Sequence, residues 1–266
     1  MPPAPLPRTV RAAAAALLLL GATTGCSLLA APNAEPPGRP ASVPPRQVVL
    51  TAAQALDDSG GARITVLQEG PAGRRTAGGT LTWGARDEGA LTVTDELGTG
   101  RLTVRDGVLD LAYQGGAAKH GDRAAAESLD PAAAVGAAPA PWAGGWMTAL
   151  VTNPGSRAYA VAQTAKLSSL GGEELGGATV AHYRGTVEVA ELFGAGGELS
   201  PQQVAATVGW YQGRGVATLG YDLWVGPGDK LLRMRETAAG TAGTTVTTTD
   251  IGPAEESTAP APGATG

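Results

Sequence analysis

Short runs in which every second side chain is apolar dominate residues 63–113. Side chains on a β-strand point alternately to opposite faces, so each run has one aliphatic face and one face of threonine and charged residues. The apolar positions of three such runs are Leu81 and Trp83, Leu91 and Val93, and Leu102 and Val104. This pattern predicts an antiparallel sheet that is buried on one face and exposed to water on the other.

Helices interrupt the predicted strands. Apolar residues recur at helical spacing over residues 47–56, and residues 154–164 form a second helix. A third helix begins with Ser200 as N-cap and Pro201 in its first turn. Strands are expected over residues 63–69, 80–84, 90–96, 101–105, 108–113, 165–174, 179–191, 217–225, 230–237 and 244–250. Runs of strands broken by a few helices predict an α+β fold in which the helices cover the apolar face of an antiparallel sheet.

A long segment rich in Ala, Gly and Pro occupies residues 115–145. Because a structureless segment of this length is unusual in a compact domain, we interpret it as a helix-containing loop or lid. Trp142 and Trp146 lie in this segment or directly after it. A tryptophan is most often a core anchor, but these two have little apolar sequence around them. We therefore expect both to line a cavity.

The core must be built almost entirely from aliphatic side chains. Hydrophobic residues make up 43% of the 266 residues but aromatic residues only 4%, and Phe193 is the single phenylalanine. Cys26 is the only cysteine, so no disulfide can form within the chain. Stability must therefore come from burial of apolar surface.

Cys26 closes a segment with the features of a lipoprotein signal. Arg8 and Arg11 precede an apolar stretch, and small residues lead into Gly25-Cys26. The apolar stretch is shorter than the ~20 residues that a spanning helix needs. These features predict a lipobox: cleavage leaves Cys26 as the N-terminus, and a diacylglycerol on its sulfur anchors the protein at the extracytoplasmic face of the cell membrane. A plain secretory signal with an incidental cysteine is the alternative.

The sequence divides into four predicted parts. Residues 1–25 form the signal peptide, and residues 26–45 form a lipidated, Pro-rich tether of extended character. Residues 46–251 form one folded domain. Residues 252–266 have the composition of a disordered tail.

The sequence indicates no catalytic, metal or nucleic-acid site. The formal net charge is −5 and no run of Lys or Arg occurs after the signal, which excludes nucleic acid as the expected partner. His120 is expected in a solvated loop, and His182 is expected as a hydrogen-bonded histidine at the surface of a strand. The sequence contains none of the nucleophile, zinc or phosphate-loop motifs. We therefore predict a protein that is not an enzyme and needs no cofactor and no metal.

Two segments resemble a known family. Residues 173–191 read G-G-x-x-x-x-H-Y-x-G-x-V, and residues 221–236 contain W-V followed by L-x-R-M-R. With the lipobox and the order of helices, they resemble the LppX/LprG lipoproteins of actinobacteria, which are related in fold to the lipoprotein carrier LolA. The resemblance implies a strongly bent antiparallel half-barrel with helices covering its concave face, and acyl chains held between sheet and helices. The sequence departs from the family at Gly226-Pro227, where an Asp usually precedes the turn glycine, and in residues 115–145.

The alternation and the resemblance together give a set of candidate ligand-lining side chains. They are Leu81, Trp83, Leu91, Val93, Leu102, Val104, Trp142, Trp146, Tyr183, Val187, Leu219 and Leu223. A broad apolar surface binds acyl chains through buried area, at about 25 cal/mol per Å², but selects weakly among them. The expected partners are therefore a lipid or other hydrophobic molecule and, through the anchor, the membrane. The alternative is a non-enzymatic protein-interaction or signalling module with a filled core and an unidentified protein partner; an envelope hydrolase is a third hypothesis.

Overall fold

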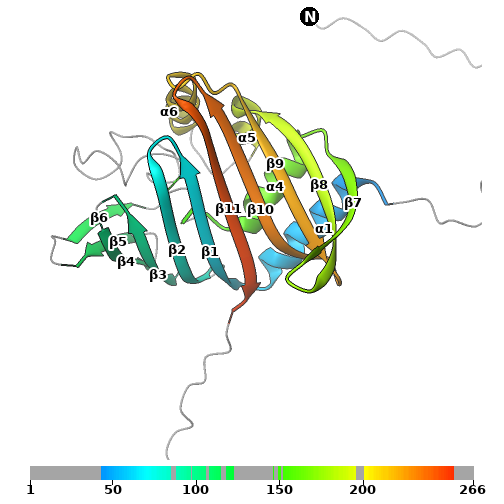
Figure 1. Cartoon of the computed structure of the whole chain (residues 1–266), viewed down its shortest axis with the longest axis horizontal. Helices are drawn as coiled ribbons and strands as arrows, with labels where there is room; N and C mark the ends of the chain where they lie inside the picture. Colours follow the sequence, from blue (N-terminus) through cyan, green and yellow to red (C-terminus); the bar gives the residue numbers. More distant parts are fainter. Residues whose placement is uncertain are drawn as a thin grey trace, which may run out of the picture. The chain divides into compact units, whose positions relative to one another are not determined.

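The computed structural model describes residues 43–84, 88–96, 98–105, 108–114, 118–122, 146, 149–150, 152–195 and 201–254. Within these residues, eleven strands form one antiparallel sheet, whose convex face is turned toward the viewer in Figure 1. Across the sheet they are β6 (Ala118–Asp122), β5 (Val108–Tyr113), β4 (Gly98–Arg105), β3 (Glu88–Asp95), β2 (Gly73–Thr82), β1 (Gly61–Gly70), β11 (Gly243–Pro253), β10 (Lys230–Gly240), β9 (Thr218–Gly226), β8 (Ala178–Glu188) and β7 (Ser168–Leu175). The first and last strands of the domain are therefore neighbours near the centre of the sheet.

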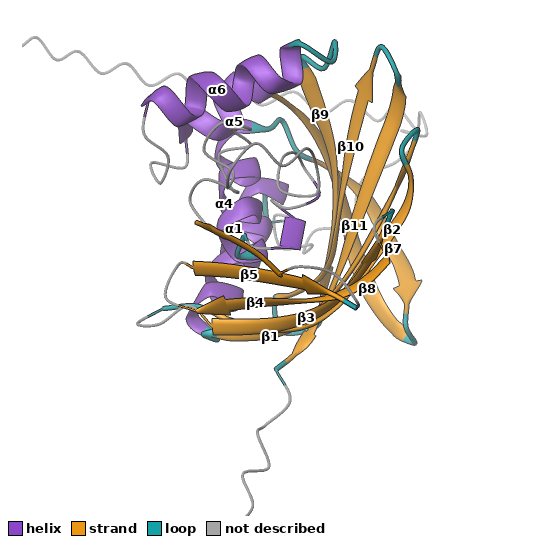
Figure 2. Cartoon of the chain, turned by 90° about the vertical axis from the view of Figure 1, so that its left-hand side faces the viewer, coloured by secondary structure: helices purple, strands orange, loops and turns teal. Residues whose placement is uncertain are grey.

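The sheet is strongly bent, and the helices lie inside the bend (Figure 2). These helices are α1 (Pro45–Asp58), α4 (Pro154–Thr164), α5 (Val189–Ala195) and α6 (Pro201–Gln212). At Gly79 of β2 a Cβ would meet the carbonyl oxygen of Ala90 on β3 at 2.0 Å, so only glycine permits this close approach of the two strands. The fold is α+β, with helices covering the concave face of an open antiparallel sheet, as the sequence predicted.

Helices α1 and α4 pack closely against each other and against the core. At Gly155 a Cβ would meet the carbonyl oxygen of Ala53 at 2.9 Å, so glycine lets α4 approach the backbone of α1. Asn153 caps α4 by accepting a hydrogen bond from the Gly155 amide at 2.8 Å. Its side-chain amide also donates to Asp57 Oδ1 at 2.6 Å, which links the start of α4 to the end of α1.

Several predicted elements differ from the observed ones. Helix α4 has the predicted bounds, but β2 begins at Gly73 rather than at residue 80. The strand predicted to reach residue 191 ends at Glu188, because Val189, Leu192 and Phe193 are buried at helical spacing and form α5. His120 was expected in a loop, but its backbone belongs to β6 and pairs with Asp110 of β5.

The ordered elements begin at Pro45 and end at Pro253, close to the predicted domain limits. Cys26, the signal peptide, most of the predicted tether and the tail from residue 255 lie outside the described residues, as does most of the predicted lid. No helix among the described residues is long and apolar enough to cross a membrane.

Candidate ligand-binding cavity on the concave face

The candidate lining side chains are buried as their alternation predicted. Trp142 lies outside the described residues, and the other eleven are all buried in one hydrophobic cluster: Leu81, Trp83, Leu91, Val93, Leu102, Val104, Trp146, Tyr183, Val187, Leu219 and Leu223. Of these eleven, however, only Trp146 lines the main cavity that the structure describes, and contact of the others with a ligand remains a prediction.

The cavity has a volume of about 290 Å³ and lies where α6 meets the tips of two hairpins, β1–β2 and β10–β11. Its aromatic walls come from Trp146, Trp210 and Tyr211. Small residues of the hairpins form part of the remaining wall: Ala72, Ala238, Gly240, Ala242 and Gly243. The volume is near the lower end of the ~300–1,000 Å³ that is typical of small-molecule sites.

A row of polar side chains crosses the concave face at one level of the sheet. In strand register, Tyr221 of β9 pairs with Glu236 of β10, and Glu236 pairs with Thr247 of β11. Thr247 in turn pairs with Gln68 of β1, and Gln68 pairs with Arg75 of β2. These five residues are called the concave polar row, and four of them line the cavity: Gln68, Arg75, Glu236 and Thr247. The sequence predicted a uniformly apolar surface here, and that prediction is wrong.

Glu236 is held by two tyrosines. Tyr221 donates its hydroxyl hydrogen bond to one carboxylate oxygen of Glu236, and Tyr211 of α6 donates to the other at 3.4 Å. Burial, and then the negative charge of Glu236, raise the pKa of both tyrosines well above the ordinary value. Both hydroxyls therefore stay protonated and remain donors at any physiological pH.

The other end of the row is an uninterrupted chain of hydrogen bonds. Gln68 Nε2 donates to Thr247 Oγ1 at 3.0 Å, and Arg75 Nη1 donates to Gln68 Oε1 at 3.2 Å. Arg75 also forms a bidentate ion pair with Glu96, with N···O distances of 2.8 and 2.7 Å. A bidentate arginine–carboxylate pair fixes the orientation of the guanidinium group. Arg75 is thus rigidly placed in the cavity wall.

Two buried polar atoms beside the row have no hydrogen-bond partner among the described residues: Trp146 Nε1 and Thr152 Oγ1. A buried polar group without a partner costs about 1–3 kcal/mol. Trp146 lines the main cavity, and Thr152 lines a second cavity of about 30 Å³. Both cavities share Tyr211, Glu236 and Thr247. The polar centre of the concave face therefore retains hydrogen-bonding capacity that the described residues do not use.

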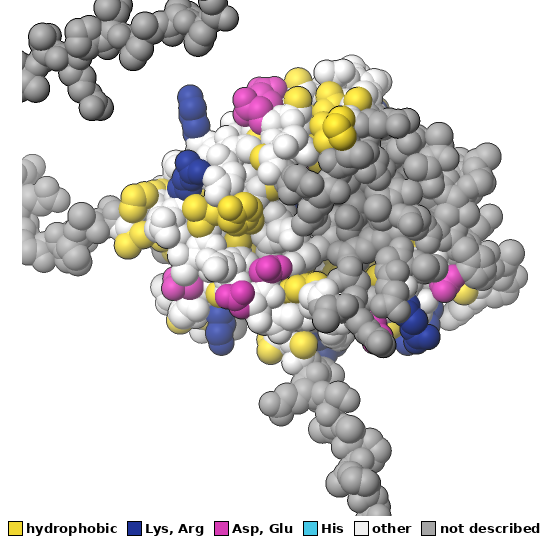
Figure 3. Space-filling model, turned by 180° about the vertical axis from the view of Figure 1, so that it is seen from behind, with side chains coloured by type: hydrophobic (Ala, Val, Ile, Leu, Met, Phe, Trp, Pro, Cys, Tyr) yellow, Lys and Arg dark blue, Asp and Glu magenta, His cyan; other side chains and the backbone are white. Residues whose placement is uncertain are grey.

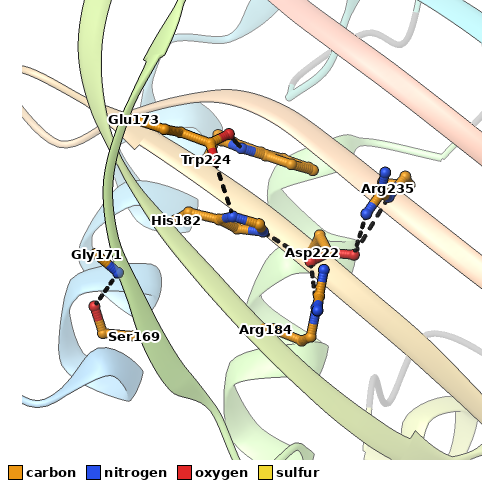
Figure 4. Close-up of polar contacts among 8 residues, drawn as sticks. All are labelled: Ser169, Gly171, Glu173, His182, Arg184, Asp222, Trp224 and Arg235. Carbon is orange, nitrogen blue, oxygen red and sulfur yellow. Dashed lines mark hydrogen bonds and ion pairs between the residues drawn. The ribbon is translucent and has the colours of Figure 1, made fainter.

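A second polar cluster lies on the opposite, convex face and is drawn in Figure 4. Asp222 of β9 is 5% exposed. Its Oδ1 atom lies 2.7 Å from both His182 Nε2 and Arg184 Nε, and its Oδ2 atom lies 2.9 Å from Arg235 Nη2. Burial by itself would raise the pKa of Asp222, but the hydrogen bonds from Arg184, Arg235 and His182 outweigh it and lower that pKa. These residues are called the convex cluster.

Trp224 covers one side of the convex cluster. Its ring stacks on His182 with centroids 4.4 Å apart, and its indole N–H donates to Glu173. Glu173 Oε2 also lies 3.3 Å from His182 Nδ1. His182 was expected at the surface, but it is 7% exposed, because this stacking covers the ring. The cluster joins β7, β8, β9 and β10. Its polar side chains form hydrogen bonds and ion pairs with one another.

Charged groups on the side that carries the helices are mixed in sign. Among the described residues of that face, acidic and basic side chains stand in small interspersed groups with apolar ones between them (Figure 3). Surfaces that bind nucleic acid instead carry clustered positive charge.

No family model matches the chain, and no curated protein matches it. Among solved structures, LprF from Mycobacterium bovis has 14% identity and a TM-score of 0.44, with 78% of this chain and 92% of that chain covered. The Mycobacterium tuberculosis lipoprotein LppX has 14% identity and a TM-score of 0.41, with coverage of 76% and 93%. MucB in the Pseudomonas aeruginosa MucA/MucB complex has 11% identity and a TM-score of 0.37, with coverage of 79% and 58%. The lipoproteins that the two motifs resemble are thus found by structure as well.

Proposed function

We propose that this chain is a membrane-anchored extracytoplasmic lipoprotein that binds or carries a lipid or other hydrophobic molecule and catalyses no reaction. The observation that supports it most is the cavity of about 290 Å³ between α6 and the concave face of the sheet. Its aromatic and small aliphatic walls favour an apolar chain, and its polar centre favours a ligand with a polar end. The sequence around Cys26 supplies the predicted anchor.

Native mass spectrometry of the purified full-length chain tests binding directly. The protein is expressed in an actinobacterial host and extracted under mild conditions, and its mass is compared before and after organic extraction. A co-purifying hydrophobic molecule is the expected result. An unliganded mass, together with no uptake of a fluorescent apolar probe, contradicts the proposal.

Substituting Cys26→Ser tests the anchor. Two acyl chains bind a membrane with roughly 0.8 kcal/mol per buried CH₂, so their loss is expected to move the protein from the membrane fraction to the supernatant. Incorporation of labelled palmitate should disappear in the same variant. Retention of the variant on membranes contradicts the lipobox assignment and leaves the cavity unaffected.

A protein-interaction or signalling module is the second candidate function. The observation that favours it is the close packing of the candidate lining residues, since Leu91, Val93, Leu102, Leu219 and Leu223 are each no more than 1% exposed. Much of the concave face is therefore filled by the protein itself. Crosslinking in cells distinguishes the two candidates: the module predicts one reproducible protein partner and no bound hydrophobic molecule.

A further inference from the structure

Two groups in the cavity wall have hydrogen-bond donors to spare. The indole N–H of Trp146, a residue only 1% exposed, meets no acceptor among the described residues. Arg214 follows α6 and is exposed; it donates from Nη1 to the Trp210 carbonyl oxygen at 3.1 Å. A guanidinium group carries five N–H donors, so most of its donors are uncommitted.

Arg214 differs from four arginines of the sheet that pair with carboxylates. Arg75 pairs with Glu96, Arg233 pairs with Asp250, and two further arginines pair with Asp222. Among the described residues no carboxylate pairs with Arg214, whose guanidinium carbon lies 3.7 Å from the centre of the Trp210 ring. This packing partly removes the group from water, and that desolvation lowers the pKa of Arg214. A partly desolvated cation in a cavity wall favours an anion beside it.

Two acceptors of the same cavity already receive hydrogen bonds. Glu236 receives the hydroxyl groups of Tyr211 and Tyr221, and Thr247 receives the Gln68 amide. What Trp146 and Arg214 add to the wall is of one kind, namely donors that need an acceptor. A cavity of about 290 Å³ is small enough for one ligand to reach both Trp146 and Arg214.

We infer that the cavity binds an amphiphile through an anionic head group, whose oxygen atoms accept hydrogen bonds from the Arg214 guanidinium and the Trp146 indole N–H. The apolar chain of the ligand lies along the small residues of the two hairpins, among them Ala72, Ala238 and Ala242. Carboxylate and phosphate head groups share this chemistry. This inference rests on the proposed function and narrows the class of ligand.

The test compares the binding of a charged ligand and of its uncharged ester to the full-length chain. cis-Parinaric acid, which fluoresces on entering an apolar site, is titrated above the pKa of its carboxyl group, and its methyl ester is titrated in parallel. The acid is expected to bind about tenfold more tightly than the ester, as a charge-assisted hydrogen bond would give. In Arg214→Gln the preference for the acid should shrink to the smaller part that the Trp146 N–H supplies, with the affinity for the ester within about twofold of its wild-type value. Arg101→Gln, at an exposed position on β4, is the matched control and should leave the preference unchanged.

Trp146→Phe provides an independent test, since it removes the N–H but keeps an aromatic wall. It should lower the affinity for the acid several-fold more than that for the ester. Equal binding of acid and ester to the wild-type protein overturns the inference and leaves the proposed function intact. Failure of both probes to bind overturns the proposed function as well. A third outcome is that neither amphiphile binds but inorganic phosphate does, in a way that depends on Arg214. The site would then be one for a free anion, and this result also overturns the inference.

Discussion

The convex cluster and the concave polar row lie on opposite faces of the same sheet, and they differ in their surroundings, since the row borders a cavity whose wall carries unused donors. Asp222 on the convex face is surrounded by three basic side chains. Glu236 on the concave face receives hydrogen bonds from two tyrosine hydroxyls, and it lines two cavities. Clusters that satisfy themselves stabilise a sheet, whereas polar groups beside a cavity with unused donors are arranged for a ligand. The difference separates a structural site from a candidate binding site.

The largest expected effect on stability comes from the convex cluster. Asp222→Ala removes the carboxylate that Arg184, Arg235 and His182 share, and should lower the free energy of unfolding by about 2–3 kcal/mol. The value is below that for a fully buried pair because both arginines are partly exposed. Arg233 and Asp250 form an ion pair that is more exposed to water. Asp250→Ala should therefore lower the free energy of unfolding by less than about 1 kcal/mol. Urea unfolding measures both, and equal losses would contradict the central role of Asp222.

The contribution of Asp222 should also depend on pH. Its pKa is lowered in the folded protein, so its stabilising effect is present above the unfolded-state pKa of about 3.9 and is lost as the pH falls through the folded-state pKa. The difference in free energy of unfolding between the wild type and Asp222→Asn should be full at pH 6 and shrink below about pH 4. A difference that grows as the pH falls would contradict this account.

A smaller effect is expected in the concave polar row. Tyr221→Phe removes one hydroxyl donor from Glu236 while Tyr211 remains, and should lower the free energy of unfolding by about 1–2 kcal/mol. Tyr159→Phe, at an exposed position on α4, should have no measurable effect. A loss for Tyr221→Phe as large as that for Asp222→Ala would show that the row is as structural as the convex cluster.

The smallest expected changes in the free energy of unfolding come from two threonines, and they differ in sign. Thr152→Val removes a buried hydroxyl that has no partner among the described residues, and should leave stability unchanged or raise it by up to about 1 kcal/mol. Thr247→Val breaks the hydrogen bond from Gln68 and should lower stability by about 1 kcal/mol. Thermal unfolding of the two variants side by side checks the prediction, and a clear loss for Thr152→Val would mean that its hydroxyl has a partner in solution.

Sequence alternation predicted which side chains are buried but not the concave polar row. For Glu236 the reason is local to β10, where the strand register shifts between Leu231 and Arg233. Simple alternation from Leu231 would place Arg233 and Arg235 on the concave face. The irregularity instead aligns Met234 and Glu236 with Leu223 and Tyr221 of β9.

The clearest missed element has a similar explanation. Val189 follows a strand whose alternating pattern it continues, so a strand was predicted, whereas burial of Leu192 and Phe193 makes the segment helical. In both cases packing against a neighbouring element decides between two structures that the alternating pattern allows. The cavity could not be predicted for the same reason, since it depends on how α6 and two hairpin tips meet.

Filling the cavity tests the central claim most directly. Ala238 of β10 lines the cavity, whereas its neighbour Ala239 is exposed. Ala238→Phe should lower the affinity for a fluorescent amphiphile about tenfold or more, because the added ring occupies the space of the chain, while Ala239→Phe should bind as the wild type does. Both variants should unfold cooperatively, so that a loss of binding is not a loss of fold. Unchanged binding by a folded Ala238→Phe protein would contradict a ligand in this cavity.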